Sequence, residues 1–210
     1  RSGMSLALVS PPLNEPLRLE DVKQQVQQFT NVDDALLRTF IVPAARDRGE
    51  LGTRRAWLTQ TWDWFLSSFP SNQSFFELPK PPLVRVVYVK YTDVSGTTHT
   101  LVEGTDYVVE APSGPRCARG RISLPYSQVW PFARPQAKSV QIRFVCGYGA
   151  TADAVPPLLR QAALMDCATL YQYRESIISG TIVAELPGST ASIYRSFRSL
   201  PSGRGCTEEP

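Results

Sequence analysis

Residues 54–70 read RRAWLTQTWDWFLSSFP, and residues 75–96 read FFELPKPPLVRVVYVKYTDVSG. Apolar and polar side chains alternate along both runs, and proline or glycine closes each of them. A period of two residues is typical of half-buried β-strands. The pattern continues to VQIRFVCGYG at 140–149, and VPPLLRQAALM at 155–165 then has the period of a helix. The runs predict strands at 56–67, 74–78, 84–92, 98–103, 106–110, 120–124 and 138–146, and a helix at 157–174.

The segment before these strands predicts two short helices. Apolar residues recur at helical spacing from Leu19 to Phe29. A second helix follows, which we expect Pro43 to kink and Gly52 to end. Helices this short do not bury an apolar stripe by themselves, so we expect them to pack on the helix at 157–174.

These elements predict an α+β fold in which a small α-helical bundle carries an inserted β region. The bundle would contain the two N-terminal helices and a long C-terminal helix, and the insertion would be antiparallel. A C-terminal tail would be extended, because its apolar residues follow the last domain-like element. The expected parts are an N-terminal arm at 1–17, a helical core at 18–54 and 150–180, the β region at 55–149 and the tail at 181–210.

The composition is that of an ordinary folded protein. The chain has 210 residues, of which 42% are hydrophobic and 20% charged, and a net charge of only +3 does not indicate a nucleic-acid partner. The four cysteines, Cys117, Cys146, Cys167 and Cys206, are widely spaced, so we expect buried thiols rather than a zinc site or a disulfide framework. No apolar run reaches the roughly 18 residues that a membrane span needs, so we expect no membrane contact.

The sequence contains few residues in patterns that indicate catalysis. His99 is the single histidine, it lies in a hairpin return, and no Gly-x-Ser-x-Gly motif accompanies it. The carboxylates are scattered, and the adjacent acidic pairs lie in the first turns of predicted helices, where the helix dipole explains them. We therefore expect no enzyme, no cofactor and no metal. A small hydrolase with carboxylates near His99 is the least favoured alternative.

Tryptophans and arginines supply two further candidate surfaces. Trp57, Trp62, Trp64 and Trp130 favour packing in or on the sheet over a stacking platform. A platform would make the chain a β-rich carbohydrate- or surface-binding module of a virion, which we keep as an alternative. Residues 111–152 contain basic side chains and no acid. A solvated sheet edge is the favoured interpretation, and contact with DNA or an acidic partner is the alternative. The candidate residues for that contact are Arg116, Arg119 and Arg121.

Several motifs, taken in order, resemble the head–tail connector family of tailed bacteriophages, also called adaptor or head-completion proteins. They are the lead-in Val9–Pro16, LEDVK at 19–23, VDDAL at 32–36, LTQTW at 58–62, ELPKPPLVRV at 77–86, YSQVWP at 126–131, FVCGYG at 144–149 and VPPLLRQA at 155–162. The resemblance covers about residues 8–180. The tail departs from it, because Leu186-Pro187-Gly188 stands where members often have a Leu-Pro-Phe-Gly-like turn.

The resemblance implies a structural virion protein of the head–tail junction, made in the host cytoplasm. Such proteins form a homo-oligomeric ring, commonly dodecameric, between the portal protein and a tail or neck protein, the stopper or tail terminator. Genomic DNA passes through the lumen without sequence recognition. In this family the helical part carries the ring contacts, and the C-terminal segment reaches the portal. The candidates for the subunit interface are Leu158, Arg160, Leu164 and Tyr171. The candidates for the portal interface are Ile193, Tyr194, Arg195, Phe197 and Arg198, which we expect to become ordered on the portal.

Overall fold

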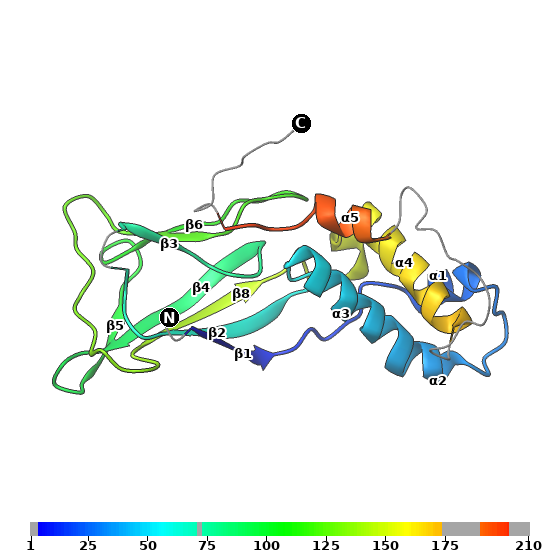
Figure 1. The fold of residues 1–210 in the computed structure, drawn as a ribbon, viewed down its shortest axis with the longest axis horizontal. Coiled ribbons are helices and arrows are strands. Elements are labelled where there is room, and N and C mark those ends of the chain that lie inside the picture. The colour runs from blue at the N-terminus through cyan, green and yellow to red at the C-terminus, as the bar shows by residue number, and fades with distance from the viewer. Residues whose placement is uncertain (1–3, 71–72, 174–189, 202–210) are drawn as a thin grey trace, which may run out of the picture. The chain divides into compact units, whose positions relative to one another are not determined.

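The computed structural model describes residues 4–70, 73–173 and 190–201. The chain forms two compact units (Figure 1). The sheet unit comprises Arg1–Pro11, Thr59–Gly147 and Ser199–Pro210, and the helical unit comprises Pro12–Leu58 and Tyr148–Arg198. Each unit contains segments that are distant in the sequence, so neither is a simple continuous stretch of chain.

The sheet unit contains two antiparallel sheets. The larger sheet has the order β1-β2-β8-β4-β5, with β1 Ser5–Ser10, β2 Gln60–Leu66, β8 Val140–Cys146, β4 Leu83–Thr92 and β5 Thr98–Leu101. The smaller sheet has the order β3-β7-β6, with β3 Phe75–Glu77, β7 Arg121–Ser123 and β6 Val108–Glu110. The seven strands predicted from the alternating pattern are confirmed; six have shorter bounds, and β4 begins one residue earlier than predicted. Residues 5–10, expected in an extended arm, pair with β2 as an eighth strand.

The two sheets face one another across an aromatic core. Trp64 of β2 and Phe76 of β3 lie with their ring centroids 6.0 Å apart. In the register of β2 and β8, Trp64 stands opposite Ile142 and Leu66 opposite Val140, so alternate residues of both strands point to this core. All five side chains are buried.

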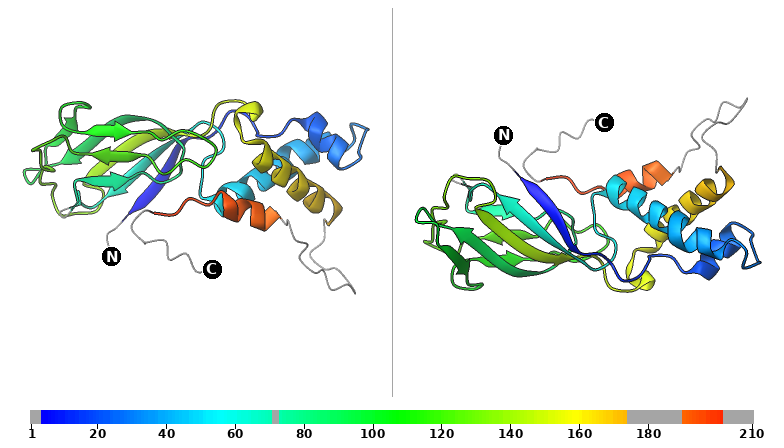
Figure 2. Two further views of the ribbon diagram at one scale, coloured as in Figure 1. Left: turned by 90° about the horizontal axis from the view of Figure 1, so that it is seen from above. Right: turned by 90° about the horizontal axis from the view of Figure 1, so that it is seen from below.

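The helical unit contains α1 Leu19–Gln25, α2 Asp34–Leu36, a π-helical turn η1 Leu37–Ile41, α3 Val42–Thr53, a 3₁₀ turn η2 Ala152–Ala154, α4 Pro157–Gln172 and α5 Thr190–Ser196. The helices α1, α3 and α5 contact α4, and α3 also contacts α5 (Figure 2). The expected packing of the N-terminal helices on the helix after Pro156 is therefore confirmed. Their shared core includes Val22, Leu37, Trp57, Leu159 and Phe197.

One local prediction for the second helix needs correction, and the expected irregularity at Pro43 takes the form of a π-turn. This turn, Leu37–Ile41, lies directly before Pro43, where the proline ring and its missing amide donor disturb the preceding turn. Gly52 does not end the helix, which continues to Thr53. Arg54 ends it in the left-handed conformation, with φ of 56°. Gly52 instead lies close to Tyr194, whose side chain would meet a Cβ atom there.

The expected fold class is wrong. The protein is not a helical bundle with one long C-terminal helix, because two antiparallel sheets form a unit of their own and the helices are short. The C-terminal segment is not extended throughout either, since Thr190–Ser196 is the helix α5. The reason is that Tyr194 and Phe197 are buried in the core of their own chain and are not exposed for contact with a partner.

Candidate interaction surfaces

The hairpin between β4 and β5 holds the single histidine in a turn network. Asp93 accepts hydrogen bonds from Ser95 Oγ at 2.6 Å and from the Thr97 amide at 3.0 Å, and its other oxygen lies 2.9 Å from His99 Nε2. These bonds, the one from Ser95 first, hold the pKa of Asp93 well below its ordinary value. The carboxylate stands between the hydroxyl and the imidazole, whereas nucleophilic catalysis needs the imidazole in the middle. The network therefore fits turn stabilisation.

The described residues also bear on metals and membranes. Among them, no three His, Cys, Asp or Glu side chains form a group that could hold a metal ion. None of the helices described is long and apolar enough to cross a membrane. Cys117, Cys146 and Cys167 are buried, as predicted, and Cys206 lies outside the described residues. Burial raises the pKa of Cys167 to about 12, so this thiol stays neutral.

The tryptophans do not form a common platform. Trp57 lies in the helical unit, where it is fully buried, and its Nε1 donates to Thr53 Oγ1 at 3.2 Å. Trp64 is buried between the two sheets, and the Lys80 ammonium lies 4.6 Å from the ring centroid of Trp62. The rings are thus engaged inside each unit, as expected for aromatic core residues.

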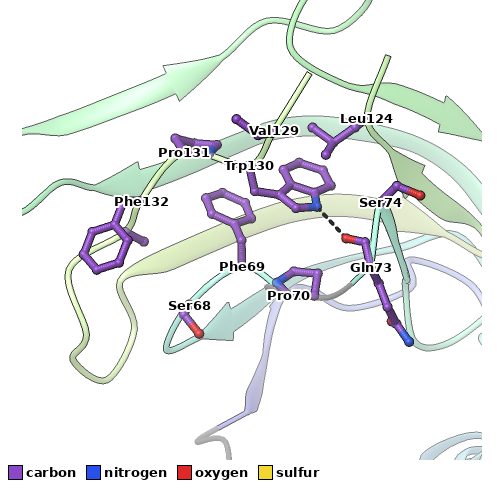
Figure 3. Close-up of a pocket in the computed structure, with 11 residues that line it drawn as sticks. Ser68, Phe69, Pro70, Gln73, Ser74, Leu124, Val129, Trp130, Pro131 and Phe132 are labelled. Atoms are coloured by element: carbon purple, nitrogen blue, oxygen red, sulfur yellow. Dashed lines mark hydrogen bonds between the residues drawn. The ribbon is translucent and has the colours of Figure 1, made fainter. Parts of the chain in front are cut away.

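The sheet unit has a pocket of about 710 Å³ at the end of β2 (Figure 3). The rings of Phe69 and Trp130 stack at 5.1 Å with an interplanar angle of 4°. Trp130 Nε1 donates to the carbonyl oxygen of Gln73 at 3.1 Å, so the indole N–H already has a partner. The lining residues are Ser68, Phe69, Pro70, Leu124, Trp130 and Pro131.

Large apolar side chains stand exposed in the loop that forms one wall of this pocket. Tyr126 is 98% exposed, Val129 82% and Phe132 71%. Val129 and Phe132 also line the pocket. Three such residues within seven positions, beside an aromatic cavity, form an exposed apolar patch of the kind found at protein–protein contacts. We call Tyr126, Val129 and Phe132 with the pocket the aromatic patch.

The outer face of the larger sheet carries a polar network. Arg143 Nε and Nη2 donate to the two oxygens of Asp63 at 2.7 and 2.8 Å. Gln141 Nε2 donates to Asp63 at 3.0 Å and to Tyr88 Oη at 3.0 Å. The hydrogen bond from Arg143, the largest cause, lowers the pKa of Asp63, and burial raises that of Tyr88. The fork geometry makes Asp63 and Arg143 a well-aligned ion pair.

The predicted basic residues are engaged within the chain. Arg121 lies 3.4 Å from a carboxylate oxygen of Glu77, and its guanidinium is 5.0 Å from the ring centroid of Phe75. Arg119 Nε donates to Ser199 Oγ at 3.2 Å. Arg116 is exposed in the loop that precedes them. Arg119 and Arg121 therefore contact neighbouring groups of the sheet unit.

The predicted subunit-interface residues differ in exposure along α4. Leu158 is exposed, and Arg160 donates to Asp153 at 3.2 Å. Leu164 packs against the core of the helical unit. Tyr171 donates to Asp33 Oδ2 at 2.5 Å, so its hydroxyl connects α4 to the loop before α2. Leu158 is the candidate most accessible to a neighbour.

The predicted portal-interface residues divide between core and surface. Tyr194 packs on Trp57, with ring centroids 5.9 Å apart, and donates to Asp166 Oδ2 at 2.7 Å. Phe197 is buried, and its carbonyl oxygen accepts a hydrogen bond from Arg55 Nε at 2.6 Å. Ile193 packs partly against the same core, whereas Arg195 and Arg198 are exposed. Sequence reasoning missed Arg48 of α3, which lines a groove with these two arginines.

Searches with the sequence found no matching family model and no matching curated protein. Solved structures do match the fold. One match is a chain of the neck of an empty gene transfer agent particle computed with C6 symmetry, with a TM-score of 0.76 and 20% identity over 98% of this chain and 100% of that chain. A second is a chain of the virion of a native gene transfer agent particle, with a TM-score of 0.75 and 21% identity over 95% of this chain and 98% of that chain.

A third match is a chain of the neck of a native gene transfer agent particle computed with C12 symmetry. It has a TM-score of 0.63 and 20% identity over 94% of this chain and 98% of that chain. The chain has the fold of a gene transfer agent neck protein. The likeness extends over both units, because almost the full length of each chain is covered.

Proposed function

We propose that this chain is a structural protein of the neck of a phage-like particle and has no enzymatic activity. The observation that carries the proposal is the fold shared along nearly the whole chain with a chain of a particle neck. Two further observations support it, since Trp57 and Trp64 are buried in packing contacts and His99 is hydrogen-bonded within a turn. The site of action would be the head–tail junction of the virion, after synthesis in the host cytoplasm.

In this proposal the chain acts as an adaptor ring, commonly dodecameric in the connector family, between the portal and a tail or neck protein. The symmetry stated for two of the similar neck structures supports a ring. A closed ring needs two different surfaces on each subunit, which meet head to tail. Leu158 on α4 would belong to one of them. DNA would pass through the lumen without sequence recognition.

The two ends of the adaptor would use different chemistry. The aromatic patch is a suitable contact for a tail or neck protein, because exposed Val129 and Phe132 line a preformed cavity and exposed Tyr126 lies in the same loop. Exposed Arg195 of α5 and exposed Arg198, just after this helix, would face the portal, while Tyr194 and Phe197 hold the segment on its own unit.

The test is electron microscopy of the purified chain with two single variants. We expect rings for the wild-type protein and fewer rings for Leu158→Glu, which places a charge in the proposed subunit contact. Val129→Glu, a matched change in the aromatic patch, should leave the rings intact and weaken binding of the tail-side protein. Loss of rings in both variants, or in neither, would contradict the assignment of surfaces.

A further inference from the structure

A groove lies between α3 and α5 in the helical unit, with a volume of about 350 Å³. It is built from two helices that contact one another, so its walls are fixed by the core that contains Trp57 and Tyr194. Gly52 lets the helices approach closely, because a Cβ atom there would lie 3.1 Å from Tyr194 Cβ. The side chains that line the groove include Arg48, Leu51, Thr190, Tyr194, Arg195 and Arg198.

Three arginines line this small space, and one carboxylate lies near Arg48. Asp166 is 2% exposed, accepts the hydrogen bond of the Tyr194 hydroxyl and lies 3.5 Å from Arg48 Nη1. In the part of the chain that the structure describes, no acidic side chain pairs with Arg195 or Arg198. The positive charges of Arg195 and Arg198, which have no acidic partner among the described residues, therefore favour an anionic occupant of the groove.

The form of the groove indicates which anion would fit. A guanidinium fork binds a carboxylate through two parallel hydrogen bonds, so Arg195 and Arg198 can each hold an acidic side chain. Leu51 at the rim is 81% exposed and offers a contact for an apolar side chain. Duplex DNA presents evenly spaced phosphates on a wide convex surface, and its charged backbone offers no apolar side chain to Leu51. A cavity of this size with a mixed basic and apolar lining suits a peptide segment better.

We propose that the α3–α5 groove binds an acidic segment of a partner protein, with an apolar side chain of that segment against Leu51 and its carboxylates on the arginines. The inference rests on the proposed function, which has α5 facing a partner, and it adds the chemistry of that partner. Arg48 would contribute as the third guanidinium, and Asp166 would keep it oriented toward the groove.

The experiment uses the full chain and a fluorescein-labelled peptide of sequence Gly-Glu-Leu-Glu-Glu-Leu-Glu-Gly, with binding followed by fluorescence anisotropy. Arg195→Glu and Arg198→Glu are each expected to weaken binding at least tenfold, because a charge-assisted hydrogen bond contributes roughly 1.5–3 kcal/mol. Arg38→Glu is the matched control, since Arg38 is exposed in η1 of the same unit and does not line the groove. It should change affinity less than twofold. Leu51→Ser should weaken binding of this peptide. It should not weaken binding of a peptide in which alanine replaces leucine.

Three results would overturn the proposal. The first is no detectable binding of the peptide, and the second is an equal loss in Arg38→Glu, which would mean general charge attraction. The third is tighter binding of a 20-base-pair duplex that is lost in the same two variants, which would make the groove a nucleic-acid contact. Ring formation, imaged separately, distinguishes the two proposals. Peptide binding without rings would contradict the adaptor ring alone, and rings without peptide binding would contradict the groove alone.

Discussion

Substitution of Gly49 by alanine tests how the helical unit is packed. Gly49 lies in the middle of α3, and a Cβ atom there would be 2.3 Å from both Cζ2 and Cη2 of Trp57. Nine in ten real Cβ contacts are longer than 3.4 Å, so the fully buried indole would have to move by about an ångström in a close-packed core. Such overpacking costs about 1–3 kcal/mol.

A second effect opposes this cost. Alanine is favoured over glycine inside a helix by about 1 kcal/mol. Gly49→Ala is therefore expected to lower the free energy of unfolding by up to about 2 kcal/mol, although the propensity alone predicts stabilisation. Ala44→Gly, at an exposed position of the same helix, measures the propensity effect without the packing effect and should cost about 1 kcal/mol.

Urea denaturation followed by circular dichroism gives the free energies for a double-mutant cycle. Phenylalanine lacks the two indole atoms that the new methyl group would meet. Gly49→Ala should therefore cost less in the Trp57→Phe background than in the wild type, with a coupling of about 1 kcal/mol or more. If Gly49→Ala stabilises the protein and shows no coupling to position 57, the reasoning about this contact is refuted.

The remaining predictions concern two polar contacts. Because its hydrogen bond to Arg143 lowers the pKa of Asp63 in the folded state, this pair stabilises the fold above pH 3.8, and the contribution is lost as the pH falls through the lower folded pKa. Asp63→Asn should thus lower the free energy of unfolding by about 1–3 kcal/mol at pH 7. It should also reduce the loss of stability measured as the pH falls from 5 to 2, and an unchanged loss would argue against the ion pair. Tyr194→Phe removes the hydroxyl that donates to buried Asp166 and should cost about 1–3 kcal/mol in the same denaturation assay, whereas a neutral result would mean that water or Arg48 replaces the donor.

The strands could be predicted because their information is local. Alternation over 84–92 and 138–146 identified β4 and β8 within two residues at each end, since a half-buried strand needs a period of two. For the N-terminal strand β1 the sequence predicts only an extended arm. The short apolar run before the prolines at 11 and 12 does not show whether a partner strand exists. That partner, β2, lies more than fifty residues later in the chain.

The candidate surfaces could be predicted only in part, for the same physical reason. The sequence predicts that Tyr194 and Phe197 make apolar contacts at an interface. It does not show whether such side chains pack on their own chain or on another protein. Trp57 was assigned to a strand face from its neighbours, whereas the structure buries it against α5. Arg48 was missed because only the packing of α3 on α5 brings it beside Arg195.

Cryo-electron microscopy of the purified chain mixed with portal particles tests the central proposal most directly. We predict a ring of this chain, with a central opening for DNA, bound to one end of the portal. Particles in which the portal stays bare while the folded chain remains monomeric would contradict it.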